Sequence, residues 1–187
     1  MNIEEIFSLI AARMVEGLMI HSQMSDYFCF LGLEGYAKCH KYHYFEENCN
    51  YRKISYYYLT HYNQIITERP FSNPNIIPAD WYKYKRQNVD MAVRKASIKA
   101  GFEKWVKWEK ESKKVYETYY QELIKLNEIA AATELQKYIV DVDYELSDAE
   151  EKLLTLTAID FDISDIIAEQ DKLAKKYKKE LKEIELC

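Results

Sequence analysis

One carboxylate falls on the predicted apolar face of each of four long helical segments: Glu16, Glu47, Glu109 and Glu145. Glu46 is rotated about 100° from Glu47, so Glu47 is the inward candidate on its segment. Buried carboxylates repel one another and lose hydration unless protons, basic side chains or metal cations compensate their charge. Two divalent ions per chain are a common solution, and carboxylate oxygens suit iron or manganese. The pattern therefore predicts a carboxylate metal centre.

The spacing of these glutamates predicts that they meet in pairs. Glu16 and Glu47 each lie about 15 residues from the break within residues 31–35, so at about 1.5 Å per residue they reach one level of an antiparallel hairpin and face one another. Glu109 and Glu145 are spaced in a similar but looser way about a second predicted turn. For each glutamate alone, the alternative is a boundary side chain whose carboxylate reaches solvent.

Histidines offer a second type of ligand on the second helical segment. His40 and His43 lie one turn apart on the Glu47 side, and His43 with Glu47 forms an i, i+4 ligand pair. The alternative is that these histidines pack in the core or at its boundary. His21 and His61 have no companion at ligand spacing along their own segments.

The elements that carry these residues are predicted to be helices only. The chain has 187 residues, of which 4 are Gly and 3 are Pro, so turn-rich sandwiches and barrels are poor interpretations. All three prolines lie within residues 67–87, which predicts one long connection between two helical hairpins. The predicted helices span residues 3–30, 36–66, 88–127, 133–157 and about 163–186.

Composition places the chain in a broad class. Its length predicts one domain over residues 1–187, with a bundle over about 3–157 and an additional C-terminal helix. No apolar run approaches the roughly 20 residues of a membrane span. Four cysteines without C-x-x-C spacing favour reduced thiols and a cytoplasmic location.

Charge gives mixed information about macromolecular partners. The formal net charge is −5, which argues against a general nucleic-acid binder. However, residues 81–125 hold 12 Lys/Arg against 6 Asp/Glu, a local excess of +6. This basic stretch is interleaved with aromatic residues, so a nucleic-acid or protein contact stays open, although a solvated helix face explains it as well.

Three short stretches carry a resemblance to a known family. Residues 23–25, 33–35 and 45–47 are similar to the turn between the first two helices, and to the second helix, of non-haem bacterial ferritins. The separation from Glu109 to Glu145 fits their last two bundle helices without a gap. Over roughly residues 8–155 the chain therefore resembles the ferritin-like superfamily.

The resemblance implies an all-α, ferritin-like four-helix bundle with a di-iron carboxylate centre. In such a centre Glu47 and Glu145 would be bridging or site ligands, and Glu16 and Glu109 terminal ligands. The family's second helix carries Glu-x-x-His, whereas here Asn50 stands at the histidine position after Glu47. An amide oxygen binds Fe²⁺ more weakly than an imidazole does.

Two functions follow as hypotheses. The first is a homo-oligomeric protein that binds two iron or manganese ions per chain and resembles ferroxidases in oxidising Fe²⁺. The alternative is a non-enzymatic bundle that has lost the metal centre and binds or inhibits another protein, for example in a nucleic-acid-processing complex. Lys152 discriminates between them, because it lies two turns beyond Glu145 on nearly the same face. If it reached the centre, its ammonium could neutralise the acids without metal.

Overall fold

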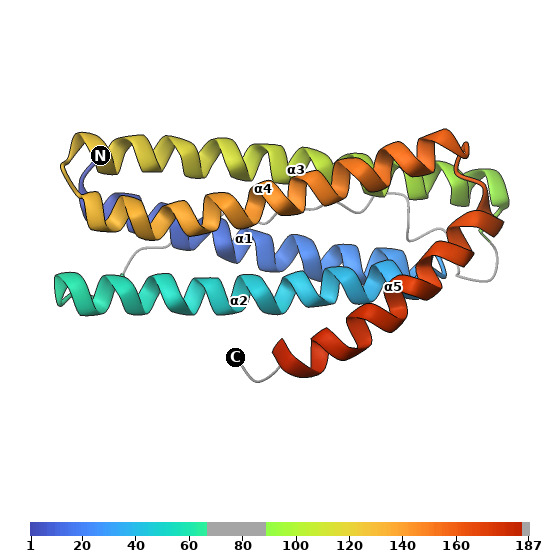
Figure 1. Ribbon diagram of the computed structural model, residues 1–187, viewed down its shortest axis with the longest axis horizontal. Coiled ribbons are helices and arrows are strands. Elements are labelled where there is room, and N and C mark those ends of the chain that lie inside the picture. Colours follow the sequence, from blue (N-terminus) through green and yellow to red (C-terminus); the bar gives the residue numbers. More distant parts are fainter. Residues whose placement is uncertain (67–88, 185–187) are drawn as a thin grey trace.

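The computed structural model describes residues 1–66 and 89–184. Within these residues the chain forms five helices and no strand (Figure 1), so the predicted all-α class is confirmed. Residues 67–88, which include the predicted long connection and the start of the basic stretch, and residues 185–187 lie outside the described residues. The helices are α1 (Ile3–Phe30), α2 (Glu34–Tyr62), α3 (Met91–Lys125), α4 (Ile129–Ala158) and α5 (Ile163–Ile184).

Local sequence signals explain where several helices begin and end. Asn2 and Glu5 form a reciprocal capping box at the start of α1. The Asp90 carboxylate accepts hydrogen bonds from the first turn of α3, and Asp162 does the same for α5. Asn127 adopts a left-handed conformation (φ 60°) after α3. The helix α4 starts at Ile129, four residues before the predicted start at residue 133. The turn between α3 and α4 therefore spans only residues 126–128.

The helices pack as two antiparallel hairpins. Figure 1 shows α1 beside α2, and α3 beside α4, while α5 turns back from the end of α4 and lies against α2. The helices α2 and α3 run in the same direction, as two hairpins joined by a crossover require. The predicted four-helix bundle with an additional C-terminal helix is therefore confirmed.

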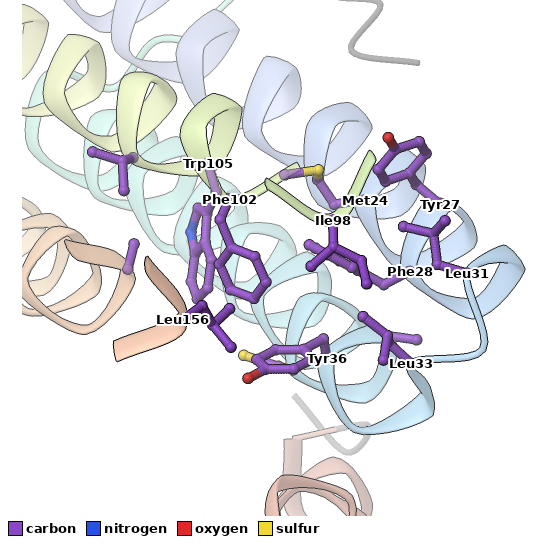
Figure 2. Packing of buried hydrophobic residues seen from close by; sticks show 14 of the residues in the cluster. Met24, Tyr27, Phe28, Leu31, Leu33, Tyr36, Ile98, Phe102, Trp105 and Leu156 are labelled. Carbon is purple, nitrogen blue, oxygen red and sulfur yellow. The ribbon is translucent and has the colours of Figure 1, made fainter. Parts of the chain in front are cut away.

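The apolar core is divided into two clusters along the bundle. One cluster lies near the α1–α2 turn and contains Phe28, Tyr36 and Phe102 (Figure 2). The other lies toward the α3–α4 turn and includes Phe7 and Tyr58. Buried polar side chains on α2 and α3 come from the sequence positions between these clusters, namely His40, His43, Glu109 and Ser112, whereas His21 and Lys152 lie at the positions of α1 and α4 that belong to the first cluster. The bundle therefore holds a polar centre between two apolar ends.

The cysteines and the basic stretch can be compared with the expectations from sequence. Cys29 and Cys39 are free thiols, as predicted, whereas Cys49 is disulfide-bonded, so the prediction of reduced thiols is wrong there. In the described part of the basic stretch, Lys95, Lys99 and Lys107 each pair with an acidic residue, which favours a solvated face. None of the five described helices is long and apolar enough to cross a membrane.

Candidate metal centre

Two groups of potential metal ligands meet at Glu145. In the first group, ligand atoms of His21, Glu109 and Glu145 all lie within 4.8 Å of one another. In the second group, the same limit holds for His43, Glu46 and Glu145. The four bundle helices all contribute, because His21 comes from α1, His43 and Glu46 from α2, Glu109 from α3 and Glu145 from α4. A carboxylate shared by two ligand groups can bridge two ions.

The first group is fully enclosed. His21 is 0% exposed and Glu109 is 1% exposed, and His21 Nε2 lies 3.7 Å from Glu109 Oε1. Trp105 Nε1 donates a hydrogen bond of 3.0 Å to the same Glu109 oxygen. Burial, aided by the charge of His43, lowers the pKa of His21 to about 3, so this imidazole is neutral. A neutral imidazole is the form that binds metal.

His40 orients the His21 ring through a contact between their Nδ1 atoms. The two Nδ1 atoms lie 3.1 Å apart, and both rings are completely buried. Burial lowers the pKa of His40 well below 6.5, so both rings are neutral and one N–H proton lies between the two Nδ1 atoms. In the tautomer where His21 donates this proton, its Nε2 has a lone pair directed away from His40. His21 Nε2 has no hydrogen-bond partner within the part of the chain that the structure describes.

The second group lies nearer the surface. His43 Nδ1 is 3.2 Å from Glu46 Oε2 and 3.5 Å from Glu145 Oε1. Burial acts to lower the pKa of His43, but the charges and hydrogen bonds of Glu145 and Cys39 together outweigh it, so the pKa lies well above 6.5. His43 is therefore a cation that partly compensates the carboxylates in the metal-free protein. A metal ion binding here would displace that proton.

Glu47 lies beside these groups and packs against α1. With Asn50, Asp141 and Glu145 it lines a small enclosed pocket. A Cβ atom at Gly17 would lie 2.6 Å from Glu47 Oε1, so the glycine provides the space that this carboxylate occupies. Burial, followed by the charge of Glu145, raises the pKa of Glu47 well above its ordinary value. Glu47 therefore tends to hold a proton in the metal-free protein.

Glu16 lies at the level predicted for it but on a different face of α1. Its Oε2 is 3.2 Å from Arg13 Nη1, and the Arg13 guanidinium stacks 3.4 Å from the Trp108 ring and donates to Ser112 Oγ. Both of these partners belong to α3. The residue of α1 that faces Glu47 is therefore Gly17, and Glu16 belongs to neither of the two ligand groups among the described residues.

Solved structures show what this architecture resembles. Neither a protein-family model nor a curated protein sequence matches the chain. A humanized archaeal ferritin is similar with a TM-score of 0.74 at 16% identity, covering 91% of this chain and 94% of that one. An engineered closed form of the Archaeoglobus fulgidus ferritin gives 0.71 at 16% identity, with 93% and 96% covered. The open-pore ferritin of that archaeon gives 0.70 at 15% identity, with 91% and 93% covered.

The chain has a ferritin-like fold. At this level of identity the similarity supports the fold alone, so the function of the ferritin-like bundle rests on its own residues.

Lys152 of the ferritin-like bundle does not join the ligand groups. Its ammonium donates to Asp148, one turn earlier on α4, and lies 5.9 Å from the centre of the Trp105 ring. The side chain is 8% exposed. Its short-range partner is therefore Asp148, and the cation closest to Glu145 among the described ion pairs is His43.

Two residues of the ligand groups were missed by the sequence analysis. His21 has no companion at ligand spacing on α1, because its neighbours Glu109 and Glu145 come from other helices. Glu46 points away from the apolar face of α2, yet it reaches Glu145 beside His43. The i, i+3 spacing of His43 and Glu46 was the available signal for the second residue. Nothing in the sequence of α1 alone marks His21.

Proposed function

We propose that this ferritin-like protein binds two iron or manganese ions per chain at a histidine–carboxylate centre. One ion would be held by His21, Glu109 and Glu145, and the other by His43, Glu46 and Glu145. The observation that carries this proposal is the convergence of two ligand groups on one carboxylate, Glu145, in the interior of the bundle. The ferritin-like fold supports it independently.

The chemistry of the donor set fits these metals. Mixed imidazole and carboxylate ligands suit Fe²⁺ and Mn²⁺. His21 Nε2 is buried without a hydrogen-bond partner among the described residues, which is costly unless another group uses its lone pair. Burial and the neighbouring acids raise the pKa of Glu47 and Glu109, so cations are needed to keep these carboxylates charged. Metal ions would satisfy both requirements.

Further parts of the proposal concern activity and assembly. Iron bound at this centre would supply redox capacity, so oxidation of Fe²⁺ by oxygen or peroxide is the proposed activity. The protein residues would orient the ions, with Glu145 between them and His40 fixing the ring of His21. We also propose a homo-oligomer, because the solved structures of similar fold are ferritins. The ligand roles of Glu16, Glu47 and Asn50 stay predictions.

The alternative function, a binding or inhibitory protein without a metal centre, required another source of positive charge. Lys152 was the candidate, and it pairs with Asp148 instead. His43 and Arg13 are the cations that act on Glu47. These cations do not keep the buried carboxyl groups ionised, because the pKa values of Glu47 and Glu109 stay raised and both groups tend to hold protons in the metal-free protein. Divalent ions could take the place of these protons, which favours the metal-binding proposal.

The test is the metal content of protein expressed in medium with added iron and manganese and purified without chelator. Wild type should hold about two ions per chain. Glu145→Ala should lose both ions because it removes the shared ligand, whereas Glu16→Ala should keep both. Loss of metal in Glu16→Ala as well as in Glu145→Ala would replace our ligand set by the one that the family resemblance implies, whereas retention of both ions in Glu145→Ala would contradict both sets. Metal-free wild type that also gains no thermal stability from added Fe²⁺ or Mn²⁺ would contradict the proposal.

A further inference from the structure

A polar cleft opens between α2, α4 and α5 and reaches the second ligand group. Its volume is about 390 Å³, and its lining includes His43, Glu46 and Glu145. The lining also includes Asp141 and Asp148 from α4 and Glu180 from α5. A surface opening therefore connects solvent with two of the proposed metal ligands and with the shared carboxylate.

The charge of this cleft selects for cations. Five carboxylates line it, whereas the basic residues of its lining are His43 and Lys176, and Lys152 pairs with Asp148, so an excess of negative charge remains. The Lys176 ammonium lies 4.9 Å from the centre of the Tyr177 ring. A concave surface with an excess of one sign of charge raises the local concentration of the opposite ion. Hydrated divalent cations are small enough to enter a space of this size.

A nearly buried histidine with an unpartnered ring nitrogen lines the same cleft. His43 is 6% exposed, lines the cleft, and its Nε2 has no hydrogen-bond partner among the described residues. By contrast, His21 and Glu109 of the first ligand group are 0% and 1% exposed and do not line the cleft. The two groups therefore differ in access to solvent, although they share Glu145.

Helix α5 builds one wall of the cleft, and close packing fixes its position. A Cβ atom at Gly35 would lie 2.1 Å from the Gln170 carbonyl oxygen, and Gly35 N donates a 3.1 Å hydrogen bond to Gln170 Oε1. Farther along α5, the Tyr177 ring is 4% exposed and lies 5.6 Å from Tyr42 and 6.5 Å from His43. The C-terminal helix thus shapes the opening above the second ligand group.

We propose that the cleft between α2, α4 and α5 is the access route for hydrated divalent cations. The His43–Glu46–Glu145 group takes up the first ion from this route, and the enclosed His21–Glu109–Glu145 group is filled after it across Glu145. The inference rests on the proposed metal binding and adds the direction from which the ions arrive. Glu180 in the lining of the cleft attracts the ions without being one of the ligands.

The experiment measures loading rate and binding stoichiometry separately. Trp105 contacts Glu109, so paramagnetic Co²⁺ or Mn²⁺ at the centre should quench tryptophan fluorescence, which stopped-flow mixing can follow in the full-length protein. The variants are Glu180→Gln and Glu180→Lys. The matched controls are Glu183→Gln and Glu183→Lys, which make the same charge changes on an exposed position of α5 outside the cleft lining.

We expect the loading rate to fall from wild type to Glu180→Gln and again to Glu180→Lys, and to show no such decrease in the two Glu183 variants. Glu180→Lys should load about threefold or more slowly than Glu183→Lys at low salt, with the difference shrinking at high salt. The number of ions bound at equilibrium should stay that of wild type. Equal rates in the two lysine variants, with normal stoichiometry, would overturn the access route and leave the metal site intact. Absence of quenching in wild type would overturn the proposed metal binding itself.

A steric version avoids reliance on charge. A bulky maleimide adduct on Glu180→Cys should slow loading more than the same adduct on Glu183→Cys, and the exposed Cys29 thiol is labelled equally in both proteins. Equal loading of the two adducts would count against the route even if the charge variants differ.

Discussion

Gly17 decides how closely the Glu47 carboxylate can approach α1. The space that a methyl group would need at this position is already taken by Glu47 Oε1. Glycine in a helix interior normally costs about 0.5–1 kcal/mol relative to alanine. Its presence here is therefore explained by the room it leaves for a buried carboxylate beside the proposed metal centre.

The first prediction concerns this pair of residues. Gly17→Ala should destabilise the wild-type background by about 1 kcal/mol or more, because Glu47 must move out of its pocket. In a Glu47→Ala background the same substitution should stabilise by about 0.5–1 kcal/mol, since only the helix preference of alanine remains. Urea unfolding of the four proteins gives both values. An identical effect of Gly17→Ala in the two backgrounds would remove the claimed contact.

The buried titratable groups predict how stability depends on pH in the metal-free protein. The pKa values of Glu47, Glu109 and His43 are raised in the folded state, so these groups keep protons that the unfolded chain releases, and stability falls as pH rises through their folded pKa values. His21 and His40 have lowered pKa values, and they cost stability only below about pH 6.5. Above that pH the first set acts alone.

We therefore expect the metal-free protein to lose unfolding free energy as the pH rises above about 6.5. Glu47→Gln/Glu109→Gln should flatten this decline, because the amides do not titrate. Thermal unfolding in a chelating buffer over this range provides the measurement. A constant or rising melting temperature in the wild type would contradict the assignment of these protons.

At the scale of helices, the sequence predicts which residues of α1 and α2 lie opposite one another along the hairpin. It does not predict how α1 is rotated about its own axis. The short turn at Gly32 (φ 81°) and the fixed rise per residue bring residues 16–17 opposite residue 47. Rotation depends on partners from another hairpin. The Arg13 guanidinium on Trp108 turns Glu16 toward α3, and neither residue carries a sequence signal for the other.

The docking of α5 on α2 gives the prediction at this scale. Gly35→Ala would place a methyl group 2.1 Å from the Gln170 carbonyl oxygen, so we expect a loss of about 1–3 kcal/mol and faster amide exchange in α5. Gln170→Ala removes only the hydrogen bond to Gly35 N and should cost about 1 kcal/mol. Hydrogen exchange and urea unfolding test both variants. Wild-type behaviour of Gly35→Ala would mean that α5 is not held by this contact.

At the scale of the whole molecule, the sequence predicts the bundle better than the site. Helix content, the hairpins and the inward position of Glu109 and Glu145 follow from periodicity, since apolar stripes must face a shared core. The ligand groups assemble from four helices, so His21 acquires its neighbours only through tertiary packing. The polar centre lies between two apolar clusters. The apolar packing on both sides therefore holds the charged side chains of different helices together in the interior.

Metal binding should be linked to the stability of the whole bundle. A ligand that binds only the folded state at 100 times its dissociation constant stabilises that state by about 2.7 kcal/mol. Saturating Mn²⁺ should therefore raise the melting temperature of wild type by several degrees, and the Glu145→Gln variant should show much less of this shift. Mg²⁺ at the same concentration controls for ionic strength. Equal shifts in wild type and variant would show that Mn²⁺ stabilises the protein elsewhere.

The most direct measurement is the anomalous scattering of manganese or iron in crystals of the metal-loaded protein. Our account predicts two peaks inside each bundle, one among His21, Glu109 and Glu145 and one among His43, Glu46 and Glu145. Crystals with no peak in the polar centre, or with a single peak held by Glu16, Glu47 and Asn50, would contradict it.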